Sequence, residues 1–383
     1  MKNDRKIIYL AGFLFSVPMA LTSYINSSFL ENYLNTYAVS ILYAFASMVS
    51  ILGFVEMPRI LARLGDRKTT FWLSFAIFIS FILLAFTHNV FVAIFGFILY
   101  FLGSNLIIAT FDIFVQDFSK GSKRIGNFRG FYLTIVNLAW VFSQTVSGTI
   151  IHKASFQGIY LVSALFMIVV MSIFLLFLND FRDPVYKNLP LIETIKRFFK
   201  NKDVTIIYIL NLLLQIFYVW MIIYIPIYLH QNMKFSWDKI GLIFTIMLIP
   251  FVALSFPLGR LSDKIGEKKI LLGGFLIISL STFIIPWFIQ PIVWLWAFIL
   301  FLTRVGAATI SVMSDNYFFK VITEENADLI GFYRNTSPVS YIIGPLLAMP
   351  FLYFLPSFVY LFYILGIIMF TGFILGFFLK DVQ

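Results

Sequence analysis

The sequence contains no cysteine, and only 12% of its 383 residues are charged. The absence of cysteine excludes disulfide bridges, thiolate metal sites and cysteine nucleophiles. Ordinary soluble domains are about 25% charged, so this chain has too little charge to cover a soluble surface. The three histidines, His88, His152 and His230, stand far apart, and no array with metal-ligand spacing accompanies them. The composition therefore predicts neither a metal centre nor another cofactor.

The sequence also lacks the motifs of an enzyme and of an ATP-binding site. The Walker pattern Gly-x-x-x-x-Gly-Lys-[Ser/Thr], which cradles nucleotide phosphates, does not occur. An intramembrane enzyme would need clustered nucleophiles, bases or metal ligands, and the sequence shows no such cluster. The net charge of +10 belongs to basic loops, described below, and does not predict a nucleic-acid partner. We therefore expect a protein that is not an enzyme.

Hydrophobic residues make up 61% of the chain, and aromatic residues make up 19%. They gather in apolar runs near 20 residues, the length at which a helix crosses the ~30 Å hydrocarbon core of a bilayer. The runs are too long and too continuous for the alternating segments of about 10 residues in a β-barrel. The sequence therefore predicts an all-α, multi-pass integral protein of the cytoplasmic membrane. Twelve membrane helices are expected, over residues 7–30, 38–61, 70–87, 90–116, 126–150, 158–179, 204–229, 238–258, 269–289, 291–318, 329–354 and 356–379.

The basic residues of the loops predict the side of the membrane on which each loop lies. Of the 28 Lys and Arg residues, 23 fall in the N-terminal segment, the even-numbered loops and the C-terminal tail, whereas the odd-numbered loops carry only three. Because basic loops stay in the cytoplasm, both termini are expected to be cytoplasmic. The longest connection divides the chain into an N-terminal bundle (1–180), a cytoplasmic linker (181–203) and a C-terminal bundle (204–383).

The two halves of the chain repeat one another. Residues 62–68 (ARLGDRK) align without gaps on residues 263–269 (DKIGEKK), and residues 126–129 (GNFR) align on residues 331–334 (GFYR). Each pair occupies the same place in its half, which is the loop after the second or eighth helix, or the start of the fifth or eleventh helix. The repeat predicts two pseudo-symmetric bundles of six helices.

The fuller loop copy resembles the signature of the major facilitator superfamily, Gly-x-Leu-x-Asp-[Arg/Lys]-x-Gly-x-[Arg/Lys]-[Arg/Lys]. Residues 259–269 read GRLSDKIGEKK, whereas the first copy has Ala62 in place of the Asp. The resemblance implies two bundles around a central cavity that opens to either side in turn. It also implies that this loop latches the bundles on the cytoplasmic side. The expected latch residues are Gly259, Asp263, Lys264, Gly266, Lys268 and Lys269, with Gly65 and Arg67 in the first copy.

Four charged residues predict two matched ion pairs within the membrane. Asp112 and Arg129 reach a similar depth in the fourth and fifth helices, and Asp315 and Arg334 repeat the arrangement in the tenth and eleventh helices. Because pairing lowers the cost of burying a charge, we expect these pairs to support the structure and to take part in gating. A buried carboxylate can titrate near neutral pH, so Asp112 or Glu56 is a candidate proton carrier.

Arg304 stands near the middle of the tenth helix, and no acidic residue is expected at its depth. Such an Arg needs an anionic substrate, a water-filled cavity, aromatic faces or carbonyl groups. It is the leading candidate for substrate binding, and the alternative is an Arg held by neighbouring helices. Other polar and aromatic residues at comparable depth are candidate cavity residues or interhelical hydrogen-bond partners: Asn105, Asn137, Gln144, Asn211, Gln215, Tyr24, Trp140 and Tyr341.

These features predict a monomeric secondary transporter of a small solute, coupled to a proton or solute gradient, with membrane lipids as its surroundings. Arg304 favours an anionic solute, and the aromatic content favours an amphiphilic one. The alternatives are multidrug or amphiphile efflux, a lipid flippase on the same fold, and a sensor that has lost transport. Drug-exporting branches of the family carry a Gly-Pro motif in the fifth helix, where residues 142–145 read FSQT, so a simple drug–proton antiporter is disfavoured.

Overall fold

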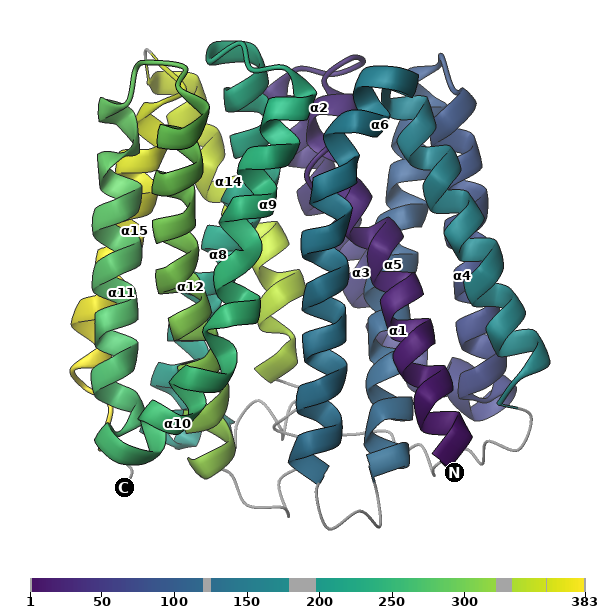
Figure 1. Ribbon diagram of the computed structural model, residues 1–383, viewed down its shortest axis with the longest axis horizontal. Helices are drawn as coiled ribbons and strands as arrows, with labels where there is room; N and C mark the ends of the chain where they lie inside the picture. The colour runs from purple at the N-terminus through teal and green to yellow at the C-terminus, as the bar shows by residue number, and fades with distance from the viewer. Residues whose placement is uncertain (1, 120–124, 179–197, 322–332, 356, 382–383) are drawn as a thin grey trace. The chain divides into compact units, whose positions relative to one another are not determined.

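The computed structural model describes residues 2–119, 125–178, 198–321, 333–355 and 357–381, with side chains except those of residues 2–5, 116–119, 125–130 and 263. All regular structure in these ranges is helical, which confirms the all-α class (Figure 1). The elements are α1 (Lys2–Ser23), α2 (Asn26–Leu30), α3 (Thr36–Leu64), α4 (Asp66–Phe86), α5 (Val90–Ser119), α6 (Ile125–Leu176), α8 (Lys202–Ile227), η1 (Tyr228–Asn232), α9 (Trp237–Ala253), α10 (Ser255–Ile265), α11 (Glu267–Ile284), η2 (Ile285–Trp287), α12 (Val293–Val321), α14 (Thr336–Phe354) and α15 (Tyr360–Gly376).

Ten of the described helical stretches are long and apolar enough to cross a membrane. One of them, Phe131–Leu176, lies within α6, whose backbone leaves helical geometry at Ala154 and Ser155, inside the predicted loop between residues 150 and 158. The apolar helix α15 is shorter, with 17 residues. These helices confirm a multi-pass integral membrane protein. The count of twelve helices and the cytoplasmic position of the termini stay predictions.

The chain divides into two compact units, each with its own packing. Unit 1 comprises Met1–Asn188 and Ser236–Gly241, and unit 2 comprises Leu189–Phe235 and Leu242–Gln383. In unit 1, α6 packs against α1 and α4, and α5 packs against α3 and α4. In unit 2, α11 packs against α12 and α15, while α8 contacts α12, α14 and α15. The predicted bundle boundaries stay a prediction, and residues 181–197 of the predicted linker lie outside the described residues.

Helices α11 and α12 approach each other closely in unit 2 because glycine lies at their contact. A Cβ atom added at Gly306 would lie 2.7 Å from the backbone nitrogen of Ile278 and 2.8 Å from the carbonyl oxygen of Gly274. Small residues at such seams let helix backbones pack closely within a membrane, where apolar side chains gain little from avoiding lipid. The seam fixes the position of α12, which carries two of the predicted functional residues, Arg304 and Asp315.

The sequence repeat has the same backbone geometry in both units. Gly65 separates α3 from α4 with φ 79° and ψ 161°, and Gly266 separates α10 from α11 with φ 83° and ψ 152°. This region of φ and ψ is essentially restricted to glycine, because a Cβ atom would clash with the backbone. The aligned glycines therefore make equivalent turns between consecutive helices.

Candidate functional site

Arg304 is buried in unit 2, with only 1% of its surface exposed. Its guanidinium carbon lies 5.2 Å from the ring centroid of Phe217 and 5.6 Å from that of Tyr218, both on α8. The hydroxyl of Tyr218 in turn donates a hydrogen bond to the carbonyl oxygen of Ala307 on α12, at 3.4 Å. Aromatic faces are one of the surroundings predicted for this Arg, and they stabilise a desolvated cation by about 2 kcal/mol.

Other predicted cavity residues of unit 2 lie on α8 and α14. The side-chain amide of Asn211 donates to the hydroxyl of Thr336 at 2.9 Å, and this bond joins α8 to α14. The indole of Trp220 makes a second link by donating to the carbonyl oxygen of Gly344 at 2.7 Å. Gln215 and Tyr341 are partly exposed. Arg304 therefore lies where α12 contacts α8, and Asn211 lies where α8 contacts α14.

Three predicted cavity residues of unit 1 lie near the contact of α1 with α6: Gln144, Tyr24 and Trp140. Gln144 is buried, and its amide donates at 2.6 Å to the carbonyl oxygen of Ala20, which belongs to the last turn of α1. The carbonyls of a last helical turn lack intrahelical partners, so Gln144 supplies a hydrogen-bond donor to the C-terminal end of α1. Tyr24 and Trp140 meet edge to face, with ring centroids 6.3 Å apart.

The remaining polar candidates of unit 1 are partly exposed. The amide of Asn105 donates to the carbonyl oxygen of Phe101 in its own helix, at 2.8 Å. Asn137 lies one helical turn before Val141 on α6 and is also partly exposed. The structure thus places Gln144, Tyr24 and Trp140 together at the α1–α6 contact, and Asn105 separately on α5.

At the glycine turn of unit 1, Arg67 links the start of α4 to the end of α6. Its Nε donates to the carbonyl oxygen of Phe174 and its Nη2 donates to that of Leu175, each at 2.6 Å. A cation at the last turn of a helix satisfies unpaired carbonyls and complements the helix dipole. The neighbouring Asp66 is fully buried. Arg67, a predicted latch residue, therefore holds two helices of one unit together.

At the matching turn of unit 2, Glu267 is buried with 1% of its side chain exposed. Its Oε1 lies 2.7 Å from the Nζ of Lys320, which is at the end of α12. Among the predicted latch residues, Lys264 and Lys269 are exposed, and Gly259 has open space where a Cβ would be. The side chain of Asp263 lies outside the described residues.

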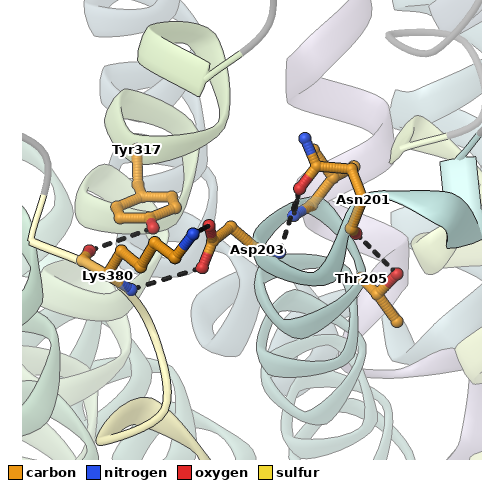
Figure 2. Close-up of polar contacts among 6 residues, drawn as sticks. Asn201, Asp203, Thr205, Tyr317 and Lys380 are labelled. Atoms are coloured by element: carbon orange, nitrogen blue, oxygen red, sulfur yellow. Dashed lines mark hydrogen bonds and ion pairs between the residues drawn. The ribbon is translucent and has the colours of Figure 1, made fainter.

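A polar cluster also holds the start of α8 in unit 2 (Figure 2). The side chain of Asn201 accepts from the backbone N–H of Asp203 at 3.0 Å and so caps the helix. The carboxylate of Asp203 accepts from the backbone N–H of Lys380 at 3.3 Å, and the hydroxyl of Tyr317 donates to the carbonyl of Lys380 at 3.0 Å. The segment after α15 is therefore tied to both α8 and α12 (Figure 2).

The predicted intramembrane ion pairs are described only in part. Asp315 lies within electrostatic range of Tyr333, the residue directly before Arg334 in the chain, and the ion pair of Asp315 with Arg334 stays a prediction. Asp112 is exposed and lies within electrostatic range of Tyr132, but the side chain of Arg129 lies outside the described residues.

Glu56, the second candidate proton carrier, is 53% exposed at its side chain. Its Oε1 lies 2.6 Å from the Nη1 of Arg59, one turn further along α3.

Sequence reasoning did not select Asp66 and Glu267 as functional candidates. They occupy equivalent positions of the repeat, each as the first residue of a helix directly after the turn glycine. Both are almost completely buried. The alignment of residues 62–68 with 263–269 could have identified them, because it pairs Asp66 with Glu267. Negative charge is favourable at the start of a helix.

Replacing Glu267 with Gln is expected to lower the free energy of unfolding by about 1–2 kcal/mol, because Lys320 loses the charge of a buried partner. Lys320 is 40% exposed, so water offsets part of the loss. Denaturant unfolding of the purified protein measures the effect. The matched control is Glu56→Gln, which removes an exposed pair with Arg59 and should cost below ~0.5 kcal/mol. Equal effects of the two substitutions would contradict a stabilising role of the buried pair.

Comparison with protein families gives one match that extends over both halves. A family model described as Major Facilitator Superfamily matches residues 8–240 and again residues 225–383. A putative proline/betaine transporter of Staphylococcus haemolyticus is 28% identical over 108 residues, which are 27% of this chain and 23% of that protein. The multidrug efflux pump SdrM of Staphylococcus aureus is 28% identical over 162 residues, 41% of this chain and 35% of the pump. The chain thus spans about a quarter to a third of these relatives' length.

Solved structures share the fold over almost the whole chain. A POT family transporter in complex with 5-aminolevulinic acid has a TM-score of 0.80 at 15% identity, covering 97% of this chain and 94% of that one. A structure from a study of substrate recognition in proton-dependent oligopeptide transporters has a TM-score of 0.74 at 13% identity, covering 98% of each chain. Similarity at this level of identity concerns the fold alone.

Proposed function

Because the chain belongs to the Major Facilitator Superfamily, we propose that it is a secondary transporter that moves a small solute across the membrane by alternating access. Ten apolar helices of spanning length support this function, as do the transporter names of its relatives. A proton or solute gradient supplies the driving force. Residues 259–269, which include the turn between α10 and α11, take part in gating together with Asp315 and Arg334.

The solute we propose carries an anionic group, and Arg304 binds it. The observation that carries this proposal is the burial of a guanidinium in the middle of α12, next to the rings of Phe217 and Tyr218. Ionisable residues at this depth are costly and are kept for function. Proline and betaine, which the name of one relative mentions, are zwitterions with a carboxylate, and this is consistent with such a site.

Efflux of amphiphilic compounds is the second candidate function. The SdrM relative supports it, and so does the aromatic contact of Tyr24 with Trp140 at the junction of α1 and α6. Aromatic faces bind organic cations by cation–π attraction, whereas a buried Arg repels them. The two candidates therefore differ in the charge of the solute that is bound.

The function is tested by reconstituting the full chain into lipid vesicles with an imposed proton gradient. Uptake of labelled proline and betaine is measured beside movement of ethidium, and a pH-sensitive dye in the lumen reports protons. We expect flux of an anionic or zwitterionic solute that is matched by proton movement. Flux of ethidium alone would support efflux instead. Failure of every solute and of protons to move would contradict transport and favour a sensor.

Proton coupling is tested in the same vesicles with two carboxylate variants. Asp112→Asn is expected to abolish solute-driven proton movement while solute exchange between equal concentrations continues. Glu56→Gln should keep both activities, because the carboxylate of Glu56 already pairs with the guanidinium of Arg59. Intact coupling in Asp112→Asn would show that another group carries the proton.

A further inference from the structure

The start of α4 and the end of α6 line an open cavity of about 150 Å³ in unit 1. Its position is the glycine turn that begins α4, next to the last turn of α6. The lining combines two cations with apolar side chains, namely Arg67, Lys68, Phe71, Trp72, Phe174 and Leu175. Arg67 is also a predicted latch residue, but neither the predicted latch nor the solute site accounts for the apolar side chains beside it.

The accessible charge at the cavity is positive. Lys68 is exposed, while the carboxylate of Asp66 is fully buried beside it. Arg67 is held in place by the bonds from its Nε and Nη2 to the end of α6, and its Nη1 takes no part in those bonds. The first backbone N–H groups of α4 add partial positive charge at the same place. An oriented guanidinium and a nearby ammonium form a favourable setting for a phosphate.

A row of aromatic rings leads away from these cations along α4. The ring centroids of Phe71 and Trp72 lie 5.5 Å apart, those of Trp72 and Phe75 lie 5.9 Å apart, and Phe78 continues the row. Trp72 is 56% exposed and Leu175 is 58% exposed, so the apolar surface beside the cations is open. Trp is enriched at the boundary between headgroups and acyl chains, because its ring has an apolar body and a polar N–H.

We propose that this cavity binds an anionic glycerophospholipid, with its phosphate at Lys68 and Arg67 and an acyl chain along Trp72 and Phe75. The charge of the cavity matches an anionic headgroup, and the aromatic row continues from the headgroup level into a helix of spanning length. The lipid belongs to the leaflet at this end of α4, which the distribution of Lys and Arg predicts to be the cytoplasmic one.

The second half of the chain supplies a matched comparison. The repeat aligns Lys68 with Lys269 and Trp72 with Gly273, which has open space where a Cβ would be. Lys269 is exposed at the start of α11, as Lys68 is at the start of α4. The second turn therefore has the cations without the aromatic row. It serves as an internal control for attraction by surface charge alone.

The experiment uses the full chain in nanodiscs that contain brominated phosphatidylglycerol or brominated phosphatidylcholine at equal fractions. Bromine quenches nearby indoles, and the difference between wild type and Trp72→Phe isolates Trp72 from the other six tryptophans. We expect the Trp72 signal to be quenched several-fold more by phosphatidylglycerol. Lys68→Gln should weaken the apparent affinity for phosphatidylglycerol about fivefold, as removal of one basic residue near an anionic surface predicts. Lys269→Gln should leave it unchanged.

Three outcomes would overturn the lipid site. Equal quenching by both lipids would show that no anionic headgroup is selected. Equal weakening by Lys68→Gln and Lys269→Gln would reduce the effect to general surface charge. Relief of quenching by soluble glycerol phosphate would identify a free phosphate compound as the occupant. Arg67 is left unchanged throughout, because its substitution would also release the end of α6.

Discussion

Replacing Arg304 with Gln is expected to raise the solute concentration for half-maximal transport by about 100-fold, which corresponds to ~2.7 kcal/mol of lost binding. The loss is this large because Arg304 is buried. In the variant, a bound carboxylate of the solute would face a neutral Gln side chain in place of the guanidinium. The maximal rate should change less, since the substitution removes binding to the ground state as well as to later states. Uptake by reconstituted vesicles over a range of solute concentrations measures both quantities.

Two further variants separate solute binding from packing around Arg304. Arg304→Lys keeps the charge but loses the planar, two-pronged donor, so it should recover only part of the affinity. Arg59→Gln removes an exposed guanidinium on α3 and should leave uptake unchanged. Arg304→Gln also loses the attraction to Phe217 and Tyr218, which lowers stability by about 2 kcal/mol. Lower stability with unchanged affinity for every transported solute would assign Arg304 a structural role alone.

The second large effect is expected at the turn glycines. Gly266→Ala should lower the free energy of unfolding by about 1–3 kcal/mol, because a Cβ atom is strained at φ 83° and ψ 152°. Gly65→Ala should cost a similar amount, since its φ of 79° and ψ of 161° place it in the same region. Denaturant unfolding of the purified variants gives both values.

A control glycine lies in the same signature. Gly259 is inside α10 with nothing near the position of a Cβ, so Gly259→Ala should be neutral or stabilising by up to ~1 kcal/mol. Asn tolerates the left-handed helical region but not the region of Gly266, so Gly266→Asn should be no better than Gly266→Ala. A rescue by Asn, or equal stability of Gly266→Ala and Gly259→Ala, would contradict strain at this turn.

Sequence reasoning reached the helical class, the family and the two equivalent turns, because each follows from a local property of the chain. Apolar runs of spanning length predict membrane helices, and the ungapped alignment of residues 62–68 with 263–269 predicts the same loop in both halves. The contacts of individual side chains were not accessible in this way. Arg67 fitted the expected latch pattern, yet its partners Phe174 and Leu175 lie more than 100 residues away in the same unit.

The candidate cavity residues show the same limit. Gln144 was selected because it is polar and lies at membrane depth. Its hydrogen bond to a carbonyl of the last turn of α1 could not be predicted, because the sequence did not show that α1 ends at Ser23. Arg304 was selected because no acid was expected at its depth, and the rings of Phe217 and Tyr218 were not predicted as its neighbours. Depth along a helix can be counted from sequence, but the direction in which a side chain points within a bundle depends on the packing of the other helices.

The contact of Lys380 with Asp203 has a consequence for how the protein is made. The two residues are separated by 177 positions, and a chain synthesised from its N-terminus delivers Asp203 long before Lys380. Asp203 at the start of α8 therefore lacks its contact with Lys380 until the helices up to α15 have been synthesised. Completion of unit 2 is a late event in biogenesis, and a bulky fusion attached just after residue 380 would slow it before it affected any step of transport.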